Sequence, residues 1–351
     1  MSHPSHHEPN NPITFNTPLC INNGQVQIHS RVMLAPMAGI TDVVFRGLVR
    51  QAAPQSLICT EMISSNGLVY SQRWDANILD KSLQDHPIAY QLAAHREEVL
   101  IRAAEEIVAR HSPDTLDLNM GCPVKKITGN FEGCALMKDV ALATQLVRAV
   151  SKAVPVPVTV KCRLGWDETS KNYLDFAEAL VEAGAKMITL HARTRAQGYR
   201  PGVDWEAFAL LKQRLGPHIP VIGNGDIVTP QDAHHVLSTY GIDGVMIGRG
   251  CQGSPWQIGR IDHYLKTGEL LPEPTLHEKL DWGWQHLTQM VAYKGETVGV
   301  REMRGQLPWY VAGFSGASVL RDQLTKVTTL SDVETIFDTV RATYPELAEA
   351  I

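Results

Sequence analysis

The chain has 351 residues, of which 44% are hydrophobic and 20% are charged, an ordinary composition for a soluble globular protein. Its formal net charge of −5 argues against a surface that binds nucleic acid all over, so any RNA site must be a local basic patch. No apolar stretch approaches the ~20 residues of a membrane helix, and we expect a cytoplasmic protein that does not contact a membrane.

The first expected segment, residues 1–26, is a flexible N-terminal extension. Its first twelve residues are polar, and they lack the apolar core of a secretory signal. His3, His6 and His7 offer metal ligands, but a disordered, solvated tail is the preferred interpretation.

Residues 27–272 alternate short apolar, β-branched runs with amphipathic segments, a pattern that predicts a parallel sheet covered by helices. Eight such units predict an α/β fold of the (β/α)8 TIM-barrel type. An open, doubly wound sheet is the alternative, but no G-x-G-x-x-G follows the first run. The predicted strands are Val32–Met37, Ser56–Met62, Pro87–Ala93, Thr115–Met120, Pro157–Leu164, Met187–His191, Pro220–Asn224 and Gly244–Gly248. The predicted helices include His95–Arg110, Val140–Ala153, Tyr173–Ala183, Trp205–Leu215 and Pro230–Ser238, the last with Thr229 as N-cap.

The alternation stops near Pro274, and residues 273–351 predict a small all-helical C-terminal domain after a linker at Pro272 and Pro274. Ser331 and Glu334 have the spacing of a capping box at the start of its last helix. The predicted helices are Leu276–Lys294, Val298–Val311, Ala317–Val327 and Asp332–Ala342.

Six cysteines are scattered without a C-x-x-C pair, which argues against a disulfide framework, a zinc site or an iron–sulfur cluster. Cys122 is placed differently from the rest, because it follows the predicted strand Thr115–Met120 inside a glycine–proline turn. A thiol at that point can reach a pocket. Cys59 and Cys162 fall within strands and are expected in the core, and Cys134 is not expected to be a second active thiol.

Polar or glycine-rich residues follow nearly every predicted strand. Because the C-terminal ends of barrel strands meet at one rim, seven such ends in phase indicate a binding site. The residues are Pro36, Met37, Ala38, Gln91, Asn119, Cys122, Lys161, Arg163, His191, Arg193, Asn224, Gly225, Asp226, Gly248 and Arg249.

The glycine-rich turns after the seventh and eighth strands stand where barrels commonly hold a phosphate. Glycines let backbone N–H groups approach an anion, and Arg249 adds charge-assisted hydrogen bonds. Tight turns that need positive φ are the alternative, but Lys161 and His191 at the same rim favour a phosphate. The backbone at residues 36–38 can lie against a flat ring, Gln91 can bond ring heteroatoms, and Lys161 can stabilise a reduced flavin. FMN meets these four conditions, although the residues alone do not settle the ligand.

The chain resembles the tRNA-dihydrouridine synthases, most closely their bacterial B-type branch. The resemblance runs from about residue 31 into the C-terminal helices. It rests on seven collinear motifs, at residues 35–42, 61–66, 117–123, 160–166, 191–194, 223–227 and 246–250, and on residues 263–269 for the branch.

The resemblance implies an FMN-bearing barrel, NADPH as reductant and a C-terminal domain that helps to hold tRNA, with no obligate protein partner. By the same mapping Cys122 is the proton donor, and Asn119 and Arg163 contact the uracil of a uridine in the D-loop region. The expected cofactor contacts are Pro36, Met37, Ala38, Gln91, Lys161, Asn224, Gly225, Asp226, Gly248 and Arg249, with His191 adjacent. Candidate RNA-backbone contacts are Lys125, Lys126, Arg193, Arg195, Arg200, Arg301 and Arg304, of which Arg193, Arg301 and Arg304 are the expected ones. A solvated surface charge is the alternative for each of them.

One departure concerns the helical domain, where relatives carry an Arg-Lys pair shortly before Trp-Tyr and this chain has Arg304-Gly305 before Trp309-Tyr310. Both aromatic residues are expected in the core. Two other functions stay open. A flavin-dependent reductase of free pyrimidines would need no helical domain, and a non-catalytic RNA-binding protein would need no intact cysteine and phosphate loops.

Overall fold

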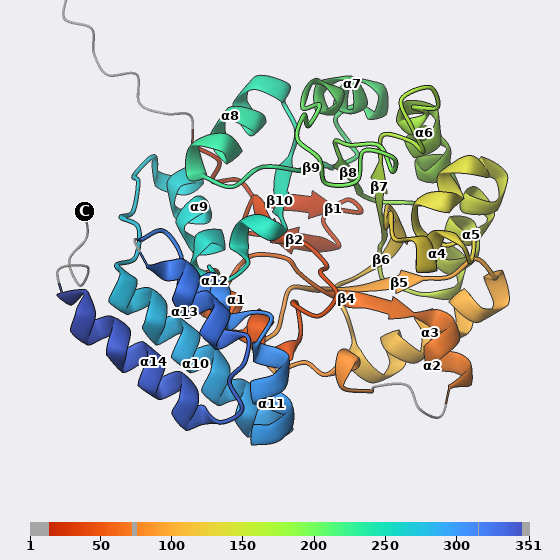
Figure 1. The fold of residues 1–351 in the computed structure, drawn as a ribbon. Coiled ribbons are helices and arrows are strands. Elements are labelled where there is room, and N and C mark those ends of the chain that lie inside the picture. Colours follow the sequence, from red (N-terminus) through yellow and green to blue (C-terminus); the bar gives the residue numbers. More distant parts are fainter. Residues whose placement is uncertain (1–13, 72–75, 315, 346–351) are drawn as a thin grey trace, which may run out of the picture.

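The structure is a computed structural model that describes residues 14–71, 76–314 and 316–345. In these residues a closed eight-stranded barrel is surrounded by helices and followed by a separate group of helices (Figure 1). This arrangement confirms the predicted (β/α)8 barrel with a helical C-terminal region. The histidine-containing tail at residues 1–12 lies outside the described residues.

The barrel strands are parallel and follow one another in chain order, and the first, β3, also pairs with the last, β10. Most strand residues are buried, as expected where a parallel sheet is covered by helices. Each of the eight predicted runs overlaps one strand. The bounds are β3 Val32–Leu34, β4 Ile58–Ser64, β5 Ile88–Ala93, β6 Thr115–Met120, β7 Val158–Arg163, β8 Ile188–His191, β9 Val221–Asn224 and β10 Gly244–Ile247.

Helices cover the outside of the barrel. Those following the strands are α1 Val43–Ala52, α2 Ser65–Tyr70, α3 Glu97–His111, α4 Lys125–Thr128, α5 Val140–Ala153, α6 Tyr173–Ala183, α7 Glu206–Leu215, α8 Pro230–Tyr240 and α9 Trp256–Thr267. Short 3₁₀ turns lie at η1 Ala76–Leu79, η2 Gly133–Lys138 and η3 Arg249–Cys251. The predicted capping box at Thr229 is present in α8. The sequence analysis missed α1, α2, α4 and α9. Asp42 is the N-cap of α1, and its carboxylate accepts hydrogen bonds from the Val44 and Phe45 N–H groups at 2.9 Å.

A β-hairpin that the sequence analysis missed closes the N-terminal end of the barrel. Its strands are β1 Leu19–Ile21 and β2 Val26–Ile28, paired antiparallel. Leu19, Ile21 and Ile28 are buried against Met33, Ala89, Met187 and other inward-facing residues. The later part of segment 1–26 is therefore ordered rather than flexible, because its apolar residues cover the barrel interior.

The C-terminal helices have a hydrophobic core of their own, apart from that of the barrel. They are α10 Leu276–Lys294, α11 Glu296–Met303, α12 Leu307–Tyr310, α13 Ala317–Leu324 and α14 Leu330–Thr343. Two expectations were wrong. The single helix predicted over Val298–Val311 is broken between α11 and α12, and α14 is capped by Thr329 with Asp332 instead of Ser331 with Glu334.

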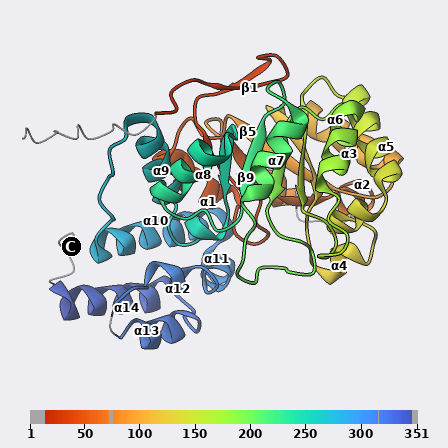
Figure 2. The same cartoon turned by 90° about the horizontal axis from the view of Figure 1, so that it is seen from above.

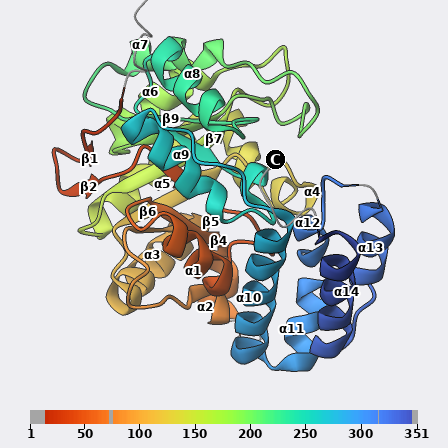
Figure 3. The same ribbon diagram turned by 90° about the vertical axis from the view of Figure 1, so that its left-hand side faces the viewer.

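The helical domain contacts the barrel through α10 and α12, which lie beside α1 and α9 (Figures 2 and 3). Tyr310 is buried at this joint, where its hydroxyl lies 3.0 Å from Nδ1 of the buried His286. Gly283 has no side chain, and a Cβ there would lie 3.0 Å from the Tyr310 ring. Gly253 of the barrel, which follows η3, lies even closer to Trp309. Gly283 thus lets α10 and α12 pack together, and Gly253 lets the barrel approach α12.

Gly253 offers a test of this close approach. Its φ is +66°, and an added Cβ would lie 2.2 Å from Cβ of Trp309. Gly241 is the control, because its φ is +64° but nothing lies within 4 Å of an added Cβ. We expect Gly241→Ala to cost only backbone strain, about 1 kcal/mol, and Gly253→Ala to cost about 3 kcal/mol because α12 must also move. Thermal and urea unfolding of the two variants measure the difference. Equal losses would show that the joint tolerates a wider spacing.

Candidate functional site

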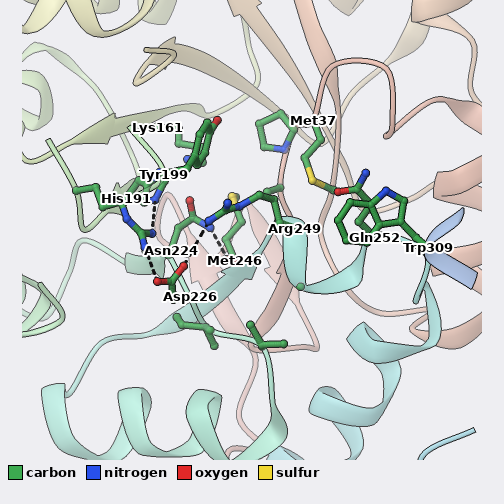
Figure 4. Close-up of a pocket in the computed structure, with 18 residues that line it drawn as sticks. Met37, Lys161, His191, Tyr199, Asn224, Asp226, Met246, Arg249, Gln252 and Trp309 are labelled. Carbon is green, nitrogen blue, oxygen red and sulfur yellow. Dashed lines mark hydrogen bonds and ion pairs between the residues drawn. The ribbon is translucent and has the colours of Figure 1, made fainter. Parts of the chain in front are cut away.

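A cavity of about 410 Å³ opens at the C-terminal ends of the barrel strands (Figure 4). Its wall comes from the C-terminal ends of β3, β7, β8, β9 and β10, from the segments that follow them, and from Trp309 of the helical domain. The lining residues include Pro36, Met37, Lys161, His191, Arg193, Tyr199, Asn224, Gly225, Asp226, Met246, Gly248, Arg249, Gln252 and Trp309. Of the predicted cofactor contacts, Ala38 and Gln91 are not among the lining residues.

One side of the cavity is formed by the turns after β9 and β10. Gly225 has a φ of +119°, and an added Cβ would lie 2.9 Å from Cδ2 of His191 and 3.0 Å from Cγ2 of Val203. Asp226 links two cations, because its carboxylate pairs with Arg193 and lies 3.5 Å from Nη2 of Arg249. The Arg249 side chain is 54% exposed, and its guanidinium lies 4.7 Å from the centre of the Tyr199 ring. This side of the cavity therefore presents the Arg249 guanidinium and the bare backbone at Gly225, where a side chain would not fit.

Next to these turns, β7 and β8 carry Lys161 and His191. Burial, followed by the charge of Arg163, lowers the pKa of Lys161 to about 8, while Asp117 opposes the shift. Among the described residues, no hydrogen bond or ion pair engages its ammonium group. Burial and then the charges of Lys161 and three arginines lower the pKa of His191 well below its ordinary value, so the imidazole is neutral at pH 7. The cavity thus offers a buried cation and a neutral ring.

A chain of hydrogen bonds crosses β5, β6 and β7 beneath the rim. The buried Asp117 carboxylate accepts from Thr159 Oγ1 at 2.6 Å and from Gln91 Nε2 at 2.8 Å. Gln91 Oε1 in turn accepts from Asn119 Nδ2 at 2.8 Å. Both ends of the Gln91 amide are thus engaged, and its side chain is fully buried. Gln91 therefore positions Asn119 from beneath the residues that line the cavity.

Asn119 holds the turn that carries Cys122. Its Oδ1 accepts from the backbone N–H groups of Cys122 at 2.9 Å and Gly121 at 3.2 Å. On the other side Gly133 packs so closely that an added Cβ would lie 2.8 Å from the Cys122 carbonyl oxygen. The thiol itself is half-buried, and burial raises its pKa above the ordinary value. A backbone hydrogen bond from Val124 and the charges of Arg163 and Lys161 lower the pKa by a smaller amount. Cys122 is therefore a protonated thiol at pH 7.

The predicted arginine contacts divide into two groups. Arg163 and Arg193 are each 1% exposed, and Arg163 donates to the carbonyls of Gly121, Thr194 and Gly198. Arg193 donates to the Arg200 carbonyl and pairs with Asp226. The structure therefore assigns both to internal support of the rim, and Arg193 does not present an RNA-facing charge. Arg301 is exposed on α11, whereas the partly buried Arg304 donates to the Val327 carbonyl at 2.7 Å.

Comparison with known proteins identifies the family. The family model for "Dihydrouridine synthase (Dus)" matches residues 33–345. The chain belongs to the dihydrouridine synthase family. It is 42% identical to a probable tRNA-dihydrouridine synthase 1 of Synechocystis sp., over 95% of this chain and 91% of that protein. It is 36% identical to tRNA-dihydrouridine synthase B of Pseudomonas putida, over 93% and 95% of the two chains. Membership makes the protein an oxidoreductase and confirms the resemblance seen in its motifs.

Solved structures of other proteins share only the fold. A histamine dehydrogenase from Rhizobium sp. 4-9 has a TM-score of 0.54 at 13% identity, over 71% of this chain and 47% of that one. A variant of NCR from Zymomonas mobilis has a TM-score of 0.52 at 15% identity, over 74% and 92%. Within the described residues of this dihydrouridine synthase family member, every helix is too short or too polar to cross a membrane.

Two aromatic residues at the cavity were missed by the sequence analysis. Tyr199 is 53% exposed and lies within 5.3 Å of the Arg163 guanidinium carbon. Trp309 is 52% exposed and lines the cavity, so the expectation that it belongs to the core was wrong, whereas Tyr310 is buried as expected. Consecutive residues of a helix point about 100° apart, so the Trp309 and Tyr310 side chains leave α12 in different directions. The sequence gives no sign of which of the two faces the cavity.

The protonation state of Cys122 can be titrated directly. The raised pKa predicts that its thiol loses the proton only above pH 9, its ordinary pKa being 9.0. Thiolate absorbance at 240 nm, measured for the protein and for Cys122→Ser across pH 6–11, isolates the titration of Cys122 as a difference. Because the folded-state pKa lies above the ordinary value, the thiol form dominates throughout pH 6–8. A difference signal with its midpoint below pH 8 would instead indicate an activated thiolate.

Proposed function

We propose that this protein is a tRNA-dihydrouridine synthase that uses FMN and NADPH to reduce the C5=C6 bond of a tRNA uridine. The observation that carries the proposal is a half-buried, protonated thiol, Cys122, held by Asn119 on the same rim as a cavity with a buried cation. A thiol in this state suits proton donation and does not suit nucleophilic attack.

The cavity residues fit FMN. The Arg249 guanidinium can bind a phosphate, and so can the backbone N–H groups at Gly225 and Gly248. An added Cβ at Gly225 would crowd the cavity wall, and one at Gly248 would point toward Met37. A flat ring is matched by the backbone at Pro36 and by Met37, with the ammonium of Lys161 available to it. FMN, when bound and reduced by NADPH, supplies hydride for C6 of the uracil. Asn224 is better suited to support the site than to bind FMN, since its amide donates to the Met246 carbonyl at 2.7 Å.

Cys122 supplies the other hydrogen. Its Sγ–H bond breaks as a C–H bond forms at C5, and the electron pair added at C6 completes the reduction of the double bond. The resulting thiolate takes a proton from solvent before the next turnover. Asn119 keeps one amide hydrogen beyond the one donated to Gln91, and this hydrogen can bond a uracil carbonyl oxygen.

Lys161 and His191 set the charge of the site. The Lys161 ammonium stabilises negative charge that develops on the ring system, and the neutral His191 does so without adding a second positive charge beside it. Arg163 contributes through its charge and through the Gly121 carbonyl that it holds at 2.9 Å. This bond anchors the turn before Cys122.

The tRNA has to reach the rim from outside the barrel. Helix α4, with exposed Lys125 and Lys126, and the C-terminal helices project on the same side of the barrel (Figures 2 and 3). Arg301 and the free part of the Arg304 guanidinium are available for phosphates on the helical domain. Gly305 lies in the break between α11 and α12 and supplies no cation where relatives are expected to carry lysine. The base that reacts must leave its stack, at a cost of a few kcal/mol that these contacts offset.

A reductase of free pyrimidines is the competing function. It would need the cavity and Cys122 but no cations on α4 and α11. Purified protein with NADPH should therefore form dihydrouridine in tRNA, measured by mass spectrometry of nucleosides, and leave free uridine unchanged. Comparable turnover of free uridine would favour the competing function.

Replacing the thiol tests the role of Cys122. In Cys122→Ala we expect dihydrouridine formation to fall by ~10²–10⁴, the usual scale for loss of a general acid. NADPH should still bleach the flavin absorbance, because hydride transfer to the cofactor does not involve the thiol. Cys134→Ala is the matched control, since that thiol is fully buried, has a pKa of about 12 and lies beside the same loop. Unchanged product formation in Cys122→Ala would overturn the assignment.

The pKa of Lys161 predicts how FMN binding depends on pH. Bound phosphate or flavin raises the pKa of this lysine above its free value of about 8, so binding is favoured while the lysine is charged. We expect the affinity for FMN to be constant from pH 7 to about 8 and to weaken as pH rises toward 10. Flavin fluorescence quenching measures the affinity, and Lys161→Gln should bind more weakly with no such inflection. An identical pH profile in both proteins would show that Lys161 does not contact FMN.

A further inference from the structure

A second hollow of about 390 Å³ lies on the same rim, outside the cofactor cavity. It is formed by segments that follow β4, β5 and β6, whereas the cavity is walled by those after β3 and β7 to β10. The two sites share no lining residue. The hollow is lined by Asn66, His95, Gly129, Asn130, Phe131, Glu132 and Leu142.

Glu132 is the polar centre of this hollow. It is 4% exposed, and its Oε1 accepts from Asn66 Nδ2 at 3.2 Å and lies 3.5 Å from His95 Nδ1. Among the described residues, Oε2 has no hydrogen-bond partner. His95 Nδ1 is also buried without a hydrogen bond. Oε2, by contrast, is not buried, so a ligand in the hollow can reach it and donate a hydrogen bond to it.

Phe131 supplies an apolar face to the same hollow. Phe131 is 55% exposed, which is high for a large hydrophobic residue. Its φ of +58° is unusual for a residue with a bulky side chain. Strain of this kind persists where the surrounding turn imposes it, and here Phe131 is held by the bond from its N–H to the Thr128 carbonyl at 3.2 Å. Helix α4, immediately before this turn, carries Lys125 and Lys126, both exposed.

We infer that this hollow binds a second, unstacked base of the tRNA, one that carries an exocyclic amino group. The base stacks on Phe131, its amino group donates to Glu132 Oε2, and Lys125 and Lys126 contact the neighbouring phosphates. Aromatic stacking with hydrogen bonding to a base edge is the usual way in which proteins read single-stranded RNA, and carboxylates accept from base amino groups. This inference rests on the proposed function, because it takes tRNA as the substrate.

The charges on the rim favour a nucleic acid over other occupants of the hollow. The lysines lie on α4, the helix that leads into the turn of Phe131. Helix α4 projects on the same side as the C-terminal helices, so one tRNA can contact both (Figure 3). Glu132 is followed by Gly133, which packs on Cys122. The site that reads the second base is thus linked by one residue to the turn that carries the proton donor.

Binding of unmodified tRNA to variants of the full chain tests the inference. We expect Phe131→Ala to weaken binding ~10-fold, the scale of one lost base stack, and Glu132→Gln to weaken it several-fold at nearly the same shape. Because both contact one base, the double variant should lose less than the product of the single losses. Leu210→Ala and Glu206→Gln on α7 are controls, since both residues are exposed on the outer ring of helices.

The readouts separate this inference from the proposed function. Fluorescence anisotropy of labelled tRNA reports binding without turnover, and flavin bleaching by NADPH should be equal in all variants. Ultraviolet cross-linking of Phe131 to tRNA, followed by mass spectrometry, should recover guanosine, cytidine or adenosine. A cross-link to uridine alone would overturn the inference. So would unchanged tRNA affinity in Phe131→Ala and Glu132→Gln with a lower kcat, because Glu132 would then act only by positioning Cys122.

Discussion

The buried carboxylate of Asp117 is the interaction on which the site depends. It lies inside the barrel on β6 and accepts hydrogen bonds from Thr159 on β7 and Gln91 on β5, so three neighbouring strands are tied at one level. Burial raises the pKa of Asp117, and the two bonds oppose that shift. Because Gln91 passes the constraint to Asn119, and Asn119 to the Cys122 N–H, the thiol is positioned by a chain that begins in the core. Loops alone would not hold it so firmly.

Charge around the cavity is arranged so that few cations are free. Asp226 occupies Arg193 and approaches Arg249, and backbone carbonyls occupy Arg163. Lys161 is left without a partner among the described residues. Burial, and then the neighbouring cations, lower the pKa of His191 and keep it neutral. A site with this distribution attracts an anion to two places, the ammonium of Lys161 and the guanidinium of Arg249, without the repulsion of a fully charged rim.

Much of this could be predicted from the sequence, for a physical reason. The strands of a (β/α)8 barrel are parallel and of similar length, so their C-terminal ends meet at one rim. Polar residues at those ends, such as Lys161, His191 and Asn224, therefore come together. Side-chain partners carry no such periodicity. Gln91 was therefore expected to touch a ligand although it holds Asn119, and Arg193 was expected to face RNA although it pairs with Asp226. The hairpin at residues 19–28 was missed because each of its strands has only three residues. Glu132 and Phe131 gave no motif, since their role depends on a turn formed far from β4 and β5 in sequence.

Trp309 has a consequence for how the two parts of the chain can be separated. It belongs to the C-terminal helices, yet it forms part of the cavity wall, and Tyr310 beside it is buried where the parts join. The helical domain is therefore not an interchangeable RNA-binding module attached to a self-sufficient catalytic barrel. Exchange of this domain between relatives would carry a piece of the cavity wall with it. A new domain would therefore change the shape of the cavity as well as the outer surface of the helices.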